Sequence, residues 1–198
     1  MIFSDKVILM ESLANTLNIL MQAFLSNMGL VFACIGSLWL IQILNKLSGY
    51  RLNHLGIWPR HPSGLAGIFI APFLHGSFEH LFLNSMVLSV LLNFMLLLGL
   101  HTCLMATIWI ITLGGGLLWL LGRPAIHIGA SGLIMGYWGF LLVSAYHLGS
   151  MFSILIALMC LYFFSSLIFN LFPIDKVSSW EGHLFGFIAG ILAVYLLR

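Results

Sequence analysis

Three groups of polar residues that could support chemistry lie in otherwise apolar stretches of this chain. The first contains His75, His80 and Asn84. His80 and Asn84 are four residues apart, so on a helix their side chains point from one face toward a common spot. Ionisable residues in apolar segments are costly and are functional candidates by default. The same residues could instead form hydrogen bonds between helices or part of a metal or haem site, although the asparagine makes a metal site less natural.

The second group surrounds Ser131, in the string Gly129-Ala130-Ser131-Gly132. A serine at the start of a helix lies among backbone N–H groups that have no partner within the helix and can stabilise an anion. The flanking glycines let a substrate or another backbone approach closely. Such strings also serve as packing material in membrane helices, so this group has little weight taken alone.

The third group is built around His183 in the last apolar segment. Glycines recur there and beside Ser131 at spacings of three or four residues, as Gly182, Gly186 and Gly190 in one segment and Gly132, Gly136 and Gly139 in the other. Strips of small residues let two membrane helices pack closely. If the two strips face each other, Ser131 and His183 meet as a nucleophile and its base must.

An acid that would complete a triad is not evident. The chain has five acidic residues, which are Asp5, Glu11, Glu79, Asp175 and Glu181. Glu79 and Glu181 each lie within two positions of a histidine and hence on a different helix face. A serine–histidine dyad is the simpler prediction, with an imidazole that is neutral at rest as a general base must be.

The composition indicates which elements must position these residues. Hydrophobic residues make up 62% of the 198 residues and charged residues 6%, which excludes a water-soluble globule. The net charge of +2 is too small and scattered for a nucleic-acid surface, so no nucleic-acid partner is expected. The cysteines Cys34, Cys103 and Cys160 lie far apart within apolar runs, which favours buried free thiols over disulfides.

Six apolar stretches can be drawn along the chain, each near the length of about 20 residues that one membrane crossing requires. They cover residues 24–44, 78–99, 102–121, 131–148, 151–172 and 183–197. Breakers and polar residues separate them where turns are needed. We therefore predict an all-α membrane protein whose residues 24–198 form one six-span domain.

The remaining segments are predicted to contact the membrane surface. Residues 47–74 mix Trp58 and Arg60 with apolar residues, which predicts a partly embedded first loop. Residues 1–23 lack a short apolar core followed by a small-residue cleavage site, so we expect no removable signal peptide and expect the first span to direct targeting. Their polar residues share one helix face, which predicts an amphipathic interfacial helix, with a seventh span as the less favoured alternative; they are Glu11, Asn15, Asn18 and Gln22.

Taken together, the three motifs resemble the rhomboid family of intramembrane serine proteases over residues 70–198. They are His75-x4-His80-x3-Asn84, Gly129-x-Ser131-Gly132 and His183-x2-Gly186-x3-Gly190, each opening an even-numbered span. The resemblance implies a six-helix bundle that cleaves transmembrane protein substrates, contacts membrane lipids and needs no cofactor or metal. It implies a bacterial inner membrane location, and oligomeric state is left open.

The same resemblance implies a role for each motif residue. Ser131 would be the nucleophile and His183 the base. His80, Asn84 and the backbone N–H of Ser131 would bind the oxyanion, while Gly129 shapes that hole and His75 supports it. A substrate helix would approach between the second and fifth spans, beneath a movable cap formed by residues 172–180.

Two departures from the family pattern affect these expectations. Met135 stands one turn after Ser131, where some members place an aromatic ring against the histidine. A thioether can also pack on imidazole, so altered orientation of the base is expected rather than its loss. The tryptophan–arginine pair that some members carry before the first motif is missing, because Trp58 and Arg60 lie too far upstream.

Charge and resemblance disagree about orientation. In six alternating spans one membrane face carries Lys46, Arg51, Arg60, Arg123 and Lys176, and the other carries Lys6 and Arg198. The positive-inside rule then puts both termini outside, whereas bacterial six-span rhomboids direct the cavity outward. We give the resemblance more weight. Two other classes stay open, a non-catalytic rhomboid-like protein that binds transmembrane clients and a histidine-ligated electron carrier or transporter.

Overall fold

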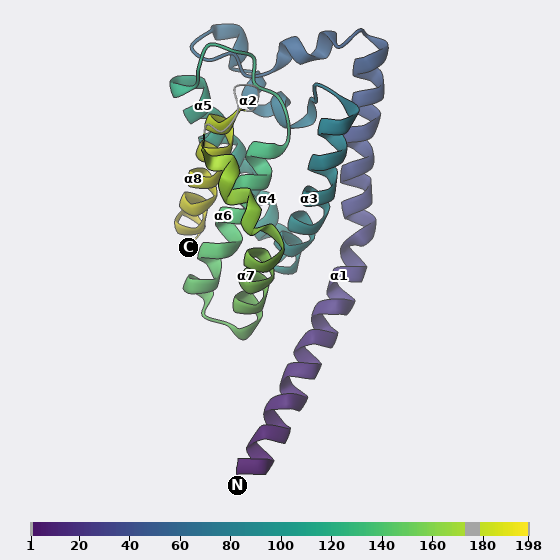
Figure 1. Ribbon diagram of the computed structural model, residues 1–198, viewed down its shortest axis with the longest axis vertical. Coiled ribbons are helices and arrows are strands. Elements are labelled where there is room, and N and C mark those ends of the chain that lie inside the picture. The colour runs from purple at the N-terminus through teal and green to yellow at the C-terminus, as the bar shows by residue number, and fades with distance from the viewer. Residues whose placement is uncertain (1, 173–178, 198) are drawn as a thin grey trace.

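The computed structural model describes residues 2–172 and 179–197, and the regular elements among these residues are helices (Figure 1). The long helices are α1 (Ile2–Leu47), α3 (Phe78–Leu97), α4 (Leu100–Trp109), α5 (Gly115–Leu121), α6 (Ser131–Leu148), α7 (Met151–Phe164) and α8 (Trp180–Leu196). A π-helical turn over Ile110–Gly114 joins α4 to α5. The 3₁₀ segment η5 (Ser165–Leu171) continues α7.

Four helical segments are long and apolar enough to cross a membrane. They are Ala14–Leu47, Phe78–Leu97, Leu100–Leu121 and Met151–Leu171. The chain is an all-α membrane protein, as predicted. α6 has 18 residues and α8 has 17, and neither belongs to this set of four. The six-span count therefore stays a prediction.

The predicted segments agree with the helices except at their ends. The stretch predicted at 183–197 begins three residues earlier, at Trp180, because Ser179 caps α8 by accepting a hydrogen bond from the backbone of Gly182. The stretch predicted at 151–172 leaves α-helical geometry at Ser165. Helix ends depend on such local contacts, which hydropathy does not report.

α1 is one helix of 46 residues with no break at the predicted boundary after residue 23. Its apolar segment Ala14–Leu47 has 34 residues, a length of about 51 Å, against a hydrocarbon core of about 30 Å. The N-terminal end of α1 extends beyond the rest of the bundle (Figure 1). The four polar residues of the predicted interfacial face are all exposed. The division into an interfacial helix and a six-span domain stays a prediction.

Polar contacts fasten α1 to α3. The Asn93 amide is completely buried, accepts a hydrogen bond from Asn27 at 3.4 Å and donates one to the Phe24 carbonyl at 3.0 Å. Nearer the other end, the Trp39 indole donates to the Ser85 hydroxyl at 3.1 Å. Such contacts matter between membrane helices because the helices gain no hydrophobic free energy by leaving lipid for each other. Packing and hydrogen bonds must therefore hold them together.

α6 and α8 cross at the two predicted glycine strips, and these strips do face each other. A Cβ added to Gly186 would collide with the Gly132 carbonyl, and one added to Gly190 would collide with the Gly136 carbonyl. One added to Gly139 would come 2.8 Å from the Phe187 carbonyl. Only glycine permits this backbone approach, which brings the first turns of both helices together.

The cysteine prediction is wrong for Cys34. Cys103 and Cys160 are buried free thiols, but Cys34 is exposed on α1. An apolar neighbourhood in sequence does not bury a residue on a helix that packs against the bundle along one side only, because its other side faces lipid.

The first loop folds as short helical turns at the end of the bundle opposite the N-terminus (Figure 1). They are η1 (Arg51–Leu55), η2 (Pro62–Gly64), α2 (Gly67–Ile70) and η3 (Ala71–Phe73). Arg60 holds the loop by donating to the carbonyls of Leu120 at 3.2 Å and Gly122 at 2.7 Å. An isolated antiparallel bridge joins Ile57 to His127. Embedding of this loop in the membrane stays a prediction.

Candidate active site

Ser131 is the first residue of α6 and follows a turn that requires a glycine. Gly129 has φ +120°, a conformation that residues with a side chain rarely adopt, and its N–H donates to the Ala71 carbonyl at 2.9 Å. A Cβ at Gly129 would lie 2.8 Å from the His80 ring. The glycine thus lets the backbone that leads into Ser131 rest directly on His80.

His75 lies behind this turn rather than in the cavity. It is completely buried, and its Nε2 accepts a hydrogen bond from the backbone N–H of Ala130 at 3.4 Å. Its ring meets the His80 ring edge to face, with centroids 5.1 Å apart. His75 therefore supports the segment that carries Ser131.

Asn84 presents a hydrogen-bond donor to the space beside Ser131. Its side chain is buried, yet among the described residues its amide nitrogen has no hydrogen-bond partner. A buried donor without a partner costs about 1–3 kcal/mol, so such a group calls for an explanation. Asn84 and Ser131 line the same cavity, where a ligand oxygen could accept this hydrogen bond.

His183 lies in the first turn of α8, and η5 orients it. Its Nδ1 lies 3.0 Å from the backbone carbonyl of Asn170. A carbonyl can only accept, so Nδ1 carries the proton and Nε2 is the basic nitrogen. The group that orients the His183 ring here is therefore a neutral backbone carbonyl.

The motif residues line one polar cavity of about 600 Å³, with His80, Asn84, Ser131 and His183 all on its wall. Gly129 and His75 lie behind this wall, in contact with the segment that leads into Ser131. A narrower branch of about 140 Å³ continues past Asn84, Ser131 and His183 between α3, α6 and η5. Met135 lines this branch beside Ser131 and His183 and is almost fully buried.

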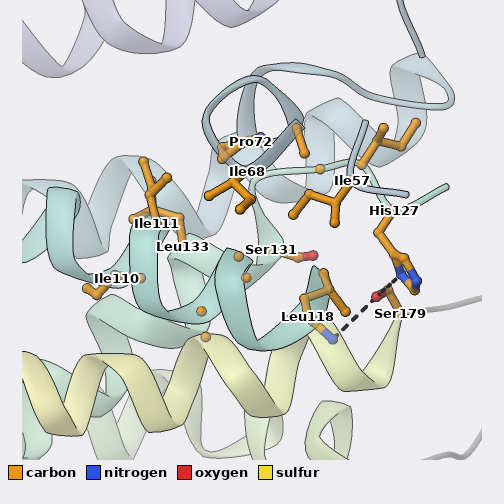
Figure 2. Close-up of a pocket in the computed structure, with 18 residues that line it drawn as sticks. Ile57, Ile68, Pro72, Ile110, Ile111, Leu118, His127, Ser131, Leu133 and Ser179 are labelled. Carbon is orange, nitrogen blue, oxygen red and sulfur yellow. Dashed lines mark hydrogen bonds between the residues drawn. The ribbon is translucent and has the colours of Figure 1, made fainter. Parts of the chain in front are cut away.

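A second, small pocket of about 60 Å³ also reaches Ser131 (Figure 2). Ile57 and Ile68 of the first loop and Leu118 of α5 form its apolar wall. Ser131, His127 and Ser179 line both this small pocket and the larger cavity.

The sequence motifs missed two contacts that hold the start of α8. His127 Nε2 donates to the Arg123 carbonyl at 3.1 Å, so Nδ1 must be the acceptor of the 2.6 Å hydrogen bond from the Ser179 hydroxyl (Figure 2). The buried Glu181 carboxylate lies 3.6 Å from the Arg123 guanidinium. Polar residues flanking an apolar segment were the available signal, but their pairing joins segments about 55 residues apart.

Two histidines outside the membrane-spanning segments are held neutral at pH 7. Burial, together with the neighbouring His80, lowers the pKa of His75 to about 4. Burial also lowers the pKa of His127, in agreement with a ring that accepts a hydrogen bond from Ser179. Within the residues that the structure describes, no three His, Cys, Asp or Glu residues gather as a metal site would need.

These features are those of an all-α integral membrane protein whose helices enclose a cavity lined in part by histidine, serine and asparagine. The family model for the rhomboid domain matches residues 62–198. The chain therefore belongs to the rhomboid family.

Similar proteins occur in mycobacteria. An uncharacterized protein of Mycobacterium bovis is 38% identical over 176 residues, which cover 84% of this chain and 73% of the relative. An uncharacterized protein of Mycobacterium leprae is 34% identical over 169 residues, which cover 81% of this chain and 67% of the relative. These relatives extend the likeness upstream of the matched domain without supplying an activity.

Proposed function

We propose that this protein is an intramembrane serine endopeptidase that cleaves transmembrane segments of other membrane proteins. The observation that carries the proposal is that Ser131 and His183, from two helices crossing at glycine, line one cavity with an unsatisfied donor from Asn84. Nucleophile, base and oxyanion donor are the parts that acyl transfer requires.

In the proposed reaction, the Ser131 hydroxyl attacks the substrate carbonyl carbon while His183 Nε2 accepts its proton. The resulting oxyanion is bound by the Asn84 amide, His80 and the N–H of Ser131. The carbon–nitrogen bond then breaks, and the His183 imidazolium protonates the departing amine. Water attacks the acyl-serine with His183 again accepting the proton, and the acid product leaves as Ser131 regains its hydrogen.

The Asn170 carbonyl supports this assignment of the base. By accepting the Nδ1 proton, it favours the tautomer whose Nε2 can act on Ser131. It also stabilises the imidazolium, on which Nδ1 still carries its hydrogen. Asn170 is thus a positioning residue that acts through its backbone.

We further propose six spans in a bacterial plasma membrane, with α6 and α8 as the fourth and sixth. At 1.5 Å per residue they measure about 27 and 26 Å, slightly less than the hydrocarbon core. Ser131 at the start of α6 then lies below the membrane surface, where the polar cavity supplies water. Substrates are transmembrane proteins, lipids surround the bundle, and nucleic acid is not a partner.

The test is cleavage of a transmembrane reporter in vesicles, together with labelling by a fluorophosphonate probe. We expect wild-type protein to cleave and to be labelled. Ser131→Ala should abolish both, and His183→Ala should reduce both strongly while the protein stays folded. Cleavage retained by purified Ser131→Ala protein would exclude the mechanism, and a folded wild type that neither cleaves nor labels would favour a non-catalytic binder.

A further inference from the structure

A side chain with a permanent positive charge lines the cavity that contains Ser131. It belongs to Arg123, in the segment between α5 and α6, which shares the cavity wall with Ser131 and His183. Among the other described residues of this wall, none is Asp, Glu or Lys. A guanidinium keeps its charge at any physiological pH. The described wall of the cavity thus presents positive charge to a ligand that enters it.

Two contacts hold Arg123 in place. Its guanidinium Nε lies 3.6 Å from the Glu181 carboxylate, and its backbone carbonyl accepts the hydrogen bond from His127 Nε2 at 3.1 Å. The Glu181 side chain is only 8% exposed, whereas the Arg123 side chain is 34% exposed. Glu181 therefore holds the guanidinium from the protein interior, and Arg123 reaches the cavity from a fixed position.

The Arg123 guanidinium can bind a second anion beside Glu181. A guanidinium carries five N–H donors in a planar fork, and this fork matches a carboxylate through two parallel hydrogen bonds. Such charge-assisted hydrogen bonds are stronger than those between neutral groups. Because apolar helices surround the cavity, an ion pair inside it is screened less by salt than one on an open surface. The cavity therefore favours a ligand that carries a carboxylate.

The size of the cavity limits where such a carboxylate can lie in a substrate. A volume of about 600 Å³ corresponds to a width of about 8 Å, which an extended chain crosses in roughly two or three residues. A peptide whose scissile carbonyl lies at Ser131 therefore places at Arg123 a side chain that is within about three positions of that carbonyl. In a peptide, Asp and Glu are the residues whose side chains end in a carboxylate.

We propose that Arg123 selects substrates by binding an Asp or Glu side chain within about three residues of the scissile bond. This inference rests on the proposed function, because it assigns the substrate class of that same site. Arg123 is then a specificity-determining residue, which binds the substrate but takes no part in breaking the bond. Transmembrane segments with an acidic residue beside the cleavage site are preferred, and those with Lys there are disfavoured because two positive charges repel.

Cleavage of a reporter series in vesicles tests this preference. The transmembrane reporters carry a single Glu, Gln or Lys at each of the three positions on either side of the scissile bond. Glu and Gln have nearly the same size, so their comparison isolates the charge. We expect kcat/KM to be at least about fivefold higher for Glu than for Gln at one or two adjacent positions, and lowest for Lys. Equal values for Glu and Gln at every position overturn the proposal.

Variants of the ion pair test whether Arg123 is the residue responsible. Arg123→Gln alone leaves the Glu181 carboxylate buried without this partner and can unfold the protein, so Glu181→Gln is compared with the double variant Arg123→Gln, Glu181→Gln. Glu181→Gln should keep the preference for Glu reporters, whereas the double variant should cleave Glu and Gln reporters equally. A preference that survives in the double variant overturns the proposal.

Arg51→Gln is the matched control for loss of a positive charge. Arg51 is exposed on the first loop and does not line the cavity. This variant should keep the full preference for Glu reporters. Loss of the preference in Arg51→Gln would show that the net charge of the protein, rather than Arg123, determines it, and would overturn the proposal.

The phosphate of an anionic lipid is another anion that Arg123 could bind. The reporters are therefore compared in vesicles of phosphatidylcholine alone and in vesicles that also contain phosphatidylglycerol. The same preference for Glu in both supports a substrate carboxylate. A preference that disappears with phosphatidylglycerol shows that Arg123 binds lipid phosphate instead, and overturns the proposal.

The reporter series also separates this inference from the proposed function. If wild type cleaves Gln and Glu reporters equally, the protease function stands and the acidic preference is wrong. If folded wild type cleaves none of the reporters, the protease function is wrong, and the acidic preference fails with it.

Discussion

The α6–α8 crossing and the region between α1, α3 and α7 are opposite solutions to packing helices in a membrane. At the crossing, glycines bring two backbones into direct contact, and the first turns of both helices carry Ser131 and His183. Between α1, α3 and α7, three helices meet through large apolar side chains and leave about 480 Å³ unfilled. Close contact holds candidate catalytic groups in register, whereas bulky side chains leave an apolar space between the helices.

The largest expected effect comes from breaking the crossing. In Gly186→Leu, the side chain must displace the Gly132 carbonyl, a change that costs at least about 3 kcal/mol and separates the dyad. We expect loss of activity and of most folded protein, measured by thermal unfolding in detergent. Gly29→Ala and Gly36→Ala are matched controls with open space around them, and neither should destabilise the protein.

Two asparagines on α3 separate catalysis from packing. Asn84 lines the cavity and its amide nitrogen has no hydrogen-bond partner among the described residues, whereas Asn93 is hydrogen-bonded to α1. Asn84→Ala should lower kcat by about 10²–10³-fold with little change in Tm, as expected for loss of an oxyanion donor. Asn93→Ala should lower Tm and leave kcat unchanged. If Asn84→Ala lowered Tm and Asn93→Ala lowered kcat instead, Asn84 would not be the oxyanion donor.

Lowering the pH should protonate His75 and so destabilise the turn that leads into Ser131. The pKa of His75 is about 4 in the folded protein and about 6.5 when unfolded, so the unfolded state binds more protons between these values. Stability should be constant above pH 6.5 and fall by on the order of 3 kcal/mol toward pH 4. Burial of His127 acts in the same direction.

Unfolding of wild type and His75→Gln from pH 7.5 to 4.5 measures this effect. The variant should start less stable, because it loses the contact with Ala130, but its stability should decline less with acid. Parallel curves for the two proteins would mean that His75 does not carry the pH dependence.

The smallest expected effect concerns the start of α8. Ser179→Ala removes the cap of the helix and the hydroxyl that donates a hydrogen bond to His127. This loss should lower the free energy of unfolding by about 1 kcal/mol. We expect a small fall in Tm and a modest fall in kcat, since His183 lies one turn further along. Ser179→Asp, which can still cap the helix, should restore Tm, and an unchanged Tm in Ser179→Ala would argue against the cap.

The motif residues could be predicted because a polar side chain in an apolar span is conspicuous at any distance from its partners. The glycine strips were equally visible, since close packing requires their spacing in each helix separately. Asn170 could not be found this way, because its backbone carbonyl contacts His183 and any residue type supplies a carbonyl. His127 and Ser179 were missed because their flanking segments are polar for ordinary reasons as well.

By itself, the sequence determined that the chain is an α-helical membrane protein of the rhomboid family, because apolar length and local motif spacing are properties of single segments. Only the tertiary structure decided that the two glycine strips meet, that a backbone carbonyl orients His183, and that α1, α3 and α7 leave an apolar space between them. Each of these depends on contacts between residues distant in the chain, and such contacts follow from how helices pack.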